Sequence, residues 1–338
     1  MPGASAPAPN VPPDLAALIA AALGRAVIPG ERAAVAVSGG PDSLALLTLA
    51  AAAFPGGVTA LTVDHGLRAG SAAEAASVAA QCGARGIPHQ TLVRAGPAFT
   101  ANRQAQARAA RYDLLGRWCA GHGHSLLLTA HHADDQAETL LMRLGRRSGS
   151  GGLAGIRSHR TLLPQVTLVR PLLGWRKTEL AAIAAAAGWQ AADDPSNHDP
   201  RHDRTRMRAL LAAAPGLDVA ALAASAAYLA ADAQALAWAA DLAWEGRVSA
   251  DGGALRIDAA GLPQALVQRV LARAIAVLAG RPARGGDVAR MAARLAAGKT
   301  CTLAGIRAHA GSVWHLAVTR PPQCGSKSPP EPGRFEAE

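Results

Sequence analysis

Short apolar runs alternate with longer helical stretches through the first half of the chain. The runs are rich in Ala, Val and Leu and predict buried strands at residues 33–37, 58–63, 89–93 and 125–130. The stretches between them have helical spacing and lie at residues 43–53, 71–85, 102–121 and 134–147. Strands that alternate with helices in this way predict an α/β fold, in which a parallel sheet carries helices on both faces.

The pattern changes near residue 216, where the chain becomes mainly helical. Two short apolar segments, 301–306 and 312–318, close this part and are expected to pair as a hairpin. The expected parts are therefore an N-terminal tail and leading helix at 1–29, an α/β domain at 30–215, a smaller mainly helical C-terminal domain with a terminal hairpin at 216–319, and a disordered Pro-rich tail at 320–338. The Gly-rich segment 148–156 predicts a mobile loop.

The first predicted strand ends at the run SGGPDS, residues 38–43, and a helix follows at once. Two glycines let a backbone approach an anion closely, and the unpaired amides of a first helical turn point toward it. The hydroxyls of Ser38 and Ser43 add donors, and Asp42 is suited to hold a cation beside phosphates. A tight turn of any α/β protein shares part of this pattern. The full run favours phosphate binding, without the lysine of a Walker A loop.

A second polar run, HHADDQAET at residues 131–139, follows the last of these predicted strands. On a helix His131, Asp135 and Glu138 share one face, which suggests a reactive site at the carboxyl end of a strand. Helix capping by His131 and Asp134 is the simpler explanation. A His/Asp metal cluster also stays open, although the run lacks the HExxH spacing of a zinc enzyme.

The loops that follow three of the predicted strands carry this candidate chemistry, at 38–43, 64–66 and 131–132. Ligands of parallel sheets bind beyond the carboxyl ends of the strands. We therefore expect the three loops to meet at one edge of the sheet and to build one site there.

Composition narrows the partners of the protein. The net charge is +10 over 338 residues, and only three of the 34 basic residues are lysines. This charge fits a polyanion, and arginine is suited to phosphate groups and to stacking on bases. Four scattered cysteines without a CxxC pair disfavour a zinc ribbon, an iron–sulfur cluster or disulfides, and they indicate reduced cytosolic thiols. We expect no signal peptide in residues 1–13 and read the alanine-rich stretch 219–244 as a soluble helix.

Several motifs in this order resemble the tRNA(Ile)-lysidine synthase family of the PP-loop ATP-pyrophosphatase superfamily. They are SGGPDS at 38–43, VDHGLR at 63–68, ARAARY at 107–112, HHADDQAET at 131–139 and RTRMR at 204–208. The resemblance covers about residues 30 to 210 and departs from the family at Thr205, where Asn is usual. It implies an adenine nucleotide alpha-hydrolase-like, PP-loop catalytic domain that binds ATP, followed by a tRNA-binding domain shorter than that of some members.

The resemblance also implies a two-step reaction. The C2 oxygen of the wobble cytidine (C34) in a tRNA(Ile) with a CAU anticodon attacks the α-phosphate of ATP, and free L-lysine then displaces AMP to give lysidine. The implied cofactors are ATP and Mg²⁺, and the implied partners are L-lysine and this tRNA. We expect a cytoplasmic enzyme without membrane contact, and the oligomeric state stays open, a homodimer included.

Roles for individual residues follow from the same resemblance. The implied ATP-binding residues are Ser38, Gly39, Gly40, Pro41, Asp42, Ser43, Asp64 and His65, and Asp42 would also hold Mg²⁺. The implied catalytic residues are Asp42, Arg108, His131, Asp135 and Glu138, of which Asp135 and Glu138 would hold the lysine. The implied substrate-binding residues are Arg111, Asp134, Asn197, Arg204, Arg206 and Arg208. Which group accepts the proton of the lysine amine stays open.

Three other functions fit parts of the pattern. A tRNA thiolase of the same superfamily would need reactive or cluster-binding cysteines, and the spacing here is unpaired. A small-molecule synthetase would not require the basic surface or the arginine-rich segment after Asn197. A non-catalytic nucleotide- or tRNA-binding module would lose affinity by turning carboxylates toward a polyanion.

Overall fold

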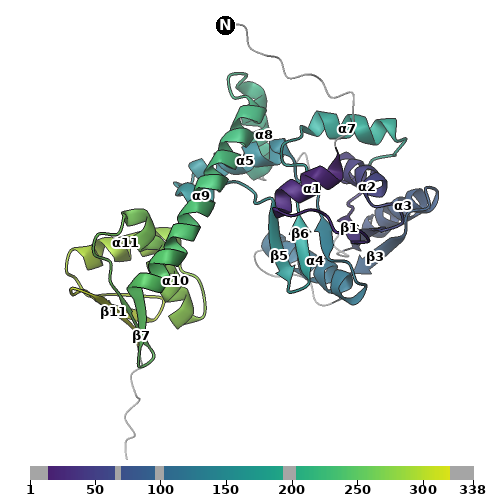
Figure 1. Cartoon of the computed structure of the whole chain (residues 1–338). Coiled ribbons are helices and arrows are strands. Elements are labelled where there is room, and N and C mark those ends of the chain that lie inside the picture. Colours follow the sequence, from purple (N-terminus) through teal and green to yellow (C-terminus); the bar gives the residue numbers. More distant parts are fainter. Residues whose placement is uncertain (1–13, 65–69, 96–102, 193–202, 320–338) are drawn as a thin grey trace, which may run out of the picture. The chain divides into compact units, whose positions relative to one another are not determined.

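The computed structural model describes residues 14–64, 70–95, 103–192 and 203–319. The chain forms two compact units, Met1–Ala231 and Asp232–Glu338 (Figure 1). The division lies inside a long helix, α9 (Val219–Arg247), whereas the sequence led us to place a boundary at residue 215. Each unit is described by itself. Of the predicted features, the tails at 1–13 and 320–338 and the residues His65 and Asn197 lie outside the described residues.

The first unit is built on a six-stranded sheet with the order β3-β2-β1-β4-β6-β5. Its strands are β1 (Ala33–Ala36), β2 (Val58–Asp64), β3 (His89–Val93), β4 (Leu126–Leu128), β5 (His159–Leu163) and β6 (Val166–Val169). All neighbours pair in parallel except β5, which runs antiparallel to β6 at the sheet edge. The predicted parallel sheet is confirmed, and the β5–β6 hairpin is an addition that the sequence analysis missed.

Helices cover both faces of this sheet, as predicted. The helices of the first unit before α9 are α1 (Leu15–Leu23), α2 (Pro41–Ala53), α3 (Ser71–Gly83), α4 (Arg103–Gly121), α5 (Ala133–Leu144), α6 (Ser150–Leu153), α7 (Lys177–Ala186) and α8 (Asp203–Ala213). Side chains of α1, α2, α3 and α7 share one core with β1, and those of α4 share a second core on the opposite face. Val35 belongs to the first core and Ala34 to the second, because successive residues of a strand point to opposite faces.

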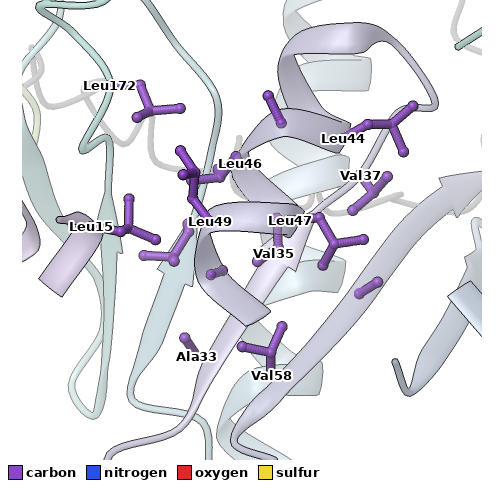
Figure 2. Packing of buried hydrophobic residues seen from close by; sticks show 14 of the residues in the cluster. Leu15, Ala33, Val35, Val37, Leu44, Leu46, Leu47, Leu49, Val58 and Leu172 are labelled. Carbon is purple, nitrogen blue, oxygen red and sulfur yellow. The ribbon is translucent and has the colours of Figure 1, made fainter. Parts of the chain in front are cut away.

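The core on the α2 face explains why β1 and α2 stay together. Leu44, Leu46 and Leu47 of α2 are fully buried, and Figure 2 shows them packed around Val35 and the neighbouring strands. A helix that is apolar on all sides in this way is a central helix. Its N-terminus is therefore held firmly at the end of β1.

Strand order places a crevice at one point of the sheet. The chain runs outward from β1 to β2 and β3, and it then returns to β4 on the other side of β1. The loops after β1 and β4 consequently leave in opposite directions, and ligands of open α/β sheets bind at such a switch point. The loops at 38–43 and 131–132 flank this point.

The Gly-rich segment that we predicted to be a mobile loop contains the short helix α6 and is tied to α5. The side-chain amide of Gln136 donates to the carbonyl of Ile156 (3.0 Å), and its oxygen accepts from the Ile156 amide (2.6 Å). Arg143 donates to the carbonyls of Gly152 and Gly155. Four polar contacts therefore hold the segment against α5.

The second unit contains more strand than we predicted. Its helices α10 (Gln264–Ala279) and α11 (Gly285–Ala296) pack on an antiparallel sheet of five strands in the order β7-β8-β11-β10-β9. The strands are β7 (Val248–Asp251), β8 (Ala254–Ile257), β9 (Cys301–Leu303), β10 (Ile306–His309) and β11 (Trp314–Val318).

The predicted terminal hairpin is wrong in its first strand. A turn at Ala304 and Gly305, whose φ angles are +53° and +82°, divides the expected strand 301–306 into β9 and the start of β10. The hairpin partner of β11 is β10, with Ile306 opposite Val318. Positive φ at a non-glycine residue is uncommon, and nothing in the local sequence announces it.

The helix α9 is, by length and composition, apolar enough to cross a membrane, which for a single helix is weak evidence. Its apolar character comes mainly from alanine, and Asp232 and Asp241 lie within it. Ala226 is fully buried in the first unit, and Ala233 is buried in the second. The interpretation of α9 as a soluble helix stays a prediction.

Replacing Gly155 by Ala should destabilise the first unit. Gly155 has a φ of +63°, and a Cβ there would overlap Oε1 of Gln136 and lie 3.1 Å from Cβ of Ala226. We expect a loss of roughly 2 kcal/mol in the free energy of unfolding, measured by urea denaturation. Gly121→Ala is the control, because no atom lies within 4 Å of its added Cβ. Equal stability of the two variants would contradict the described packing of the segment after α6.

Candidate active site

The turn after β1 has the geometry of an anion-binding loop. Gly39 has a φ of +85°, and a Cβ there would lie 3.3 Å from Cγ2 of Val78, so the position requires glycine. The amide of Ser38 donates to Oγ of Ser43 (3.2 Å), and this hydroxyl donates to the carbonyl of Gly40 (2.9 Å). The helix α2 begins directly after Gly40. The first amides of the helix therefore face the space beyond the strand ends, as the sequence predicted.

A cavity of about 890 Å³ opens at this edge of the sheet. This volume lies within the usual range for small-molecule sites, about 300–1,000 Å³. The predicted site residues that line the cavity are Ser38, Gly40, Pro41, Asp42, Ser43, Arg108, Arg111, His131, Asp135, Arg204 and Arg208. Phosphate-binding groups and ionisable side chains from the two separate motifs therefore share one space.

Four other predicted residues lie beside the cavity without lining it, and a fifth points elsewhere. Gly39 shapes the turn behind Gly40, and Asp64 ends β2, where it accepts a hydrogen bond from Ser71 (2.7 Å). Asp134 and Glu138 are engaged with arginines on the protein side of the cavity wall. Arg206 is exposed and pairs with Asp203 on its own helix.

His132 is surrounded by carboxylates. Its Nε2 lies 3.5 Å from Oδ2 of Asp42 and 3.6 Å from Oδ2 of Asp135, and its Nδ1 lies 3.6 Å from Oδ2 of Asp134. Burial disfavours the charged imidazole, but hydrogen bonds to Asp134 and Asp42 and the charge of Asp135 raise the pKa of His132 to about 10. The backbone amide of Asp135 also lies 3.4 Å from Nδ1 of His132, which is the N-cap of α5. At neutral pH a cation thus joins the loops after β1 and β4.

His131 has the opposite environment, although it is the adjacent residue. It is buried against the cavity, with Nδ1 3.1 Å from Oγ1 of Thr129. Burial first, and then the positive charges of Arg170 and Arg108, lower the pKa of His131 well below its ordinary value. The ring is neutral at pH 7 and can accept a proton. It precedes α5, so it does not lie on the helical face on which we predicted it.

Two arginines of α8 meet the acids of α5. Nη1 of Arg204 lies 3.8 Å from Oδ1 of Asp135, and Nε of Arg208 lies 2.5 Å from Oε1 of Glu138. Glu138 is only 1% exposed, and its Oε2 has no hydrogen-bond partner. Burial raises the pKa of Glu138, although Arg208 opposes the shift. Asp135 is therefore directly open to the cavity, and Glu138 reaches it through Arg208.

The contacts of Asp134 give this residue a structural role. Its carboxylate accepts hydrogen bonds from the Arg176 guanidinium (3.2 and 3.3 Å) and from the backbone amide of Lys177 (2.9 Å). Burial opposes ionisation, but His132, the Lys177 amide and Arg176 hold the pKa of Asp134 well below its usual range. It fastens the start of α7 to α5, and its predicted contact with substrate stays a prediction.

Relatives with assigned names resemble most of the chain. The tRNA(Ile)-lysidine synthase of Novosphingobium aromaticivorans is 45% identical over 297 residues, which cover 87% of this chain and 90% of that protein. The tRNA(Ile)-lysidine synthase of Zymomonas mobilis is 40% identical over 83% of this chain and 87% of its own length. The chain belongs to the tRNA(Ile)-lysidine synthase family.

Two further comparisons agree with membership of this family of ligases. The PP-loop domain family matches residues 15–214, which are almost the whole of the first unit. The solved U34-tRNA thiolase NcsA from Methanococcus maripaludis superposes with a TM-score of 0.51 at 17% identity, over 63% of this chain and 76% of that one. At this identity the likeness shows the fold alone. The predicted family, fold class and ligase activity are confirmed.

The three cysteines that the structure describes, Cys82, Cys119 and Cys301, are free thiols. Cys82 and Cys119 are buried on α3 and α4, and burial raises the pKa of Cys119 to about 12. Within the described residues, no group of His, Cys, Asp and Glu has the arrangement of a metal cluster.

Sequence reasoning missed three contributors to the site of this family member. His132 lies in the run HHADDQAET, but the catalytic role was assigned to its neighbour His131. Lys177 lines the cavity from the start of α7, and Arg170 sets the charge around His131. The signal for His132 was available, because a histidine between a strand and two aspartates is a natural bridge for carboxylates. No local signal marks the other two.

Replacing His132 by Ala should leave its carboxylates uncompensated. We expect a loss of about 3 kcal/mol in the free energy of unfolding at pH 6, because a buried charge pair is broken by removing one partner. A raised pKa stabilises the fold fully below the ordinary value of 6.5 and loses this effect as pH rises through about 10. The difference between wild type and variant, measured by denaturation across this range, should therefore shrink with pH. A constant difference would show that His132 acts by packing alone.

Proposed function

We propose that the protein ligates free L-lysine onto C2 of the wobble cytidine, C34, of tRNA(Ile) with a CAU anticodon, using ATP. An adenylated cytidine would be the intermediate, and the products would be lysidine, AMP and pyrophosphate, which changes decoding from AUG to AUA. The observation that carries the proposal is a single cavity lined by both the PP-loop turn and the pair His131 and Asp135. A phosphate site and a proton-accepting site side by side suit activation followed by amine attack.

In the first step the C2 oxygen of cytosine attacks the α-phosphorus of ATP, and pyrophosphate leaves. Negative charge grows on the phosphates, and the amides beside Gly39 and Gly40 with the hydroxyl of Ser38 can stabilise it. The hydroxyl of Ser43 can add a hydrogen bond if it turns away from the carbonyl of Gly40. Arg108 lines the same cavity and can neutralise developing charge.

Asp42 fits the role of a magnesium ligand. Its Oδ1 is buried without a hydrogen-bond partner, and its Oδ2 faces His132. A hard oxygen ligand with a free lone pair at a phosphate site suits Mg²⁺, which is commonly bound through one or two carboxylates and substrate phosphates. Bound there, the ion would neutralise phosphate charge.

In the second step the ε-amine of lysine attacks C2, and AMP leaves. A lysine ammonium has a pKa of about 10.4 in water, so the site must hold the cation and then take its proton. Asp135 opens to the cavity and can hold the ammonium, and the neutral ring of His131 can accept the proton. Glu138 can also hold the ammonium if Arg208 turns away from it toward the substrate.

An RNA substrate is consistent with the net positive charge of the protein and with the arginines of α8. The wobble base is unpaired in an anticodon loop, so turning it into a cavity is less costly than opening a duplex. Arg204 and Arg208 line the cavity and are available to the loop. We propose that the enzyme is soluble and located in the cytoplasm.

The direct test measures pyrophosphate and AMP release from Mg·ATP with a CAU-anticodon tRNA(Ile), with and without lysine, followed by mass analysis of the nucleosides. We expect AMP release that depends on lysine and a cytidine heavier by one lysine minus one water. Cleavage of ATP without this mass gain would contradict the lysine assignment. No cleavage at all would favour a binding module.

Asp42→Ala and Asp135→Asn should separate the two steps. We expect Asp42→Ala to lower pyrophosphate release by at least about 100-fold while tRNA affinity stays within about twofold, because charge stabilisation at the phosphates is lost. Asp135→Asn should keep tRNA-dependent pyrophosphate release and raise the KM for lysine by about tenfold or more, because an ammonium loses its carboxylate.

Arg117→Ala is the control for these variants, because Arg117 is exposed, pairs with Asp113 and lines no described cavity. An equal loss of both steps in both aspartate variants would contradict the division of roles.

A further inference from the structure

A second cavity of about 520 Å³ adjoins the first, and its lining is strongly cationic. The two cavities share Arg108 and Arg204. Among its fourteen described lining residues none is Asp or Glu, and seven are arginines: Arg108, Arg143, Arg146, Arg157, Arg160, Arg170 and Arg204. They come from α4, α5, α8 and the β5–β6 hairpin with the segment before it.

Most of these arginines have no carboxylate partner among the described residues. Arg146 pairs with Asp203 at 2.5 Å, and Arg204 lies 3.8 Å from Asp135. The other five have no acidic partner in the parts of the chain that the structure describes. Arg143 is occupied by the carbonyls of Gly152 and Gly155, which neutralise no charge.

Arg170 shows the shortage of acceptors most clearly. This residue is 5% exposed. Its Nη1 donates to the carbonyl of Arg157 (2.7 Å), and its Nε is buried without a hydrogen-bond partner. Burial lowers the pKa values of both Arg108 and Arg170, Tyr112 opposes the shift, and neighbouring arginines add to it. A buried guanidinium with an unused donor is costly unless an anion accepts from it.

Among the described residues, Tyr112 compensates part of this charge, and its hydroxyl accepts a hydrogen bond from Arg108 (3.4 Å). Tyr112 lies with its ring centroid 4.8 Å from the guanidinium of Arg160, 5.2 Å from Arg108 and 5.4 Å from Arg111. Cation–π contacts attract weakly compared with a full negative charge. The ring gathers the arginines into one cluster, and the cluster still needs an anion.

We propose that this second cavity binds phosphodiester groups of the RNA backbone next to the target nucleotide. The inference rests on the proposed function, and it adds where the backbone of the substrate lies. Several arginines without acids suit several neighbouring phosphates. The phosphates of ATP have their own amide-rich turn in the first cavity. A backbone seated in the second cavity brings one base past the shared Arg108 and Arg204 into the first.

Arg157 and Arg160 are the residues to change, because both are exposed and neither belongs to the proposed chemical machinery. The test compares wild type with the double variant Arg157→Gln/Arg160→Gln in the full chain. Arg117→Gln is the matched control, since Arg117 is an exposed arginine of α4 that pairs with Asp113 and lines neither cavity.

The measurement is the Kd for a CAU-anticodon stem-loop RNA as salt rises from about 50 to 200 mM. We expect the double variant to bind at least about tenfold more weakly at low salt. The slope of log Kd against log salt should fall by about 0.7 for each RNA phosphate that the variant no longer binds. The control should bind like wild type. An unchanged Kd and slope in the double variant would overturn the proposal.

Binding of ATP and of inorganic pyrophosphate separates the two sources of phosphate. We expect both affinities to be the same in the double variant and in wild type. Weaker pyrophosphate or ATP binding with unchanged RNA binding would assign the cavity to nucleotide phosphates and overturn the proposal.

Neutral phosphate analogues locate the contact on the RNA. A methylphosphonate on either side of the target cytidine should weaken binding to wild type and should cause little further loss in the double variant. Fully additive losses would overturn the proposal. These assays use neither lysine nor turnover. A protein that passes them but forms no lysidine refutes the proposed function alone, and a lysidine-forming enzyme that fails them refutes only this inference.

Discussion

The site depends on one electrostatic contact, the charged ring of His132 between the acids of two loops. Asp42 follows β1 and Asp135 begins α5 after β4, so the contact spans the point where the strand order reverses. Without a cation, the carboxylates gathered there would repel one another. With it, the PP-loop turn and the reactive end of α5 face the same cavity.

The two adjacent histidines show how the surroundings decide what a side chain does. His132 is held as a cation by three carboxylates, and His131 is held neutral by burial and by arginines. At neutral pH His132 carries a positive charge, and His131 stays neutral. Such divergent protonation of like groups is how one cavity can combine charge stabilisation with base chemistry.

The arginines divide in a similar way. Arg204 and Arg208 of α8 lie next to the acids of α5. The arginines around Tyr112 have no acidic partner among the residues that the structure describes, and their positive charge favours an anion there. The net charge of the chain states only that cations are in excess. Only the structure distinguishes the arginines that lie next to acids from those that do not.

Much of the first unit followed from its pattern of apolar residues. Buried strands and their helices are encoded locally, and the predicted and observed bounds of β3 coincide. The β5–β6 hairpin was missed because both strands are short and the edge strand β5 mixes His, Arg and Thr with Leu. In the second unit, the positive φ of Ala304 hid a turn inside an apparent strand. Both failures concern short elements whose pairing is decided by distant partners.

By itself, the sequence determined the phosphate turn and the family, because the glycines, hydroxyls and helix start of the turn act within a few consecutive residues. It also named the acids of α5. Only the tertiary structure decided that His132 carries the charge, that Arg208 covers Glu138, and that Arg170 joins Arg108 at a second cavity. The physical reason is that charge, burial and protonation depend on neighbours in space, and here those neighbours lie tens of residues apart along the chain.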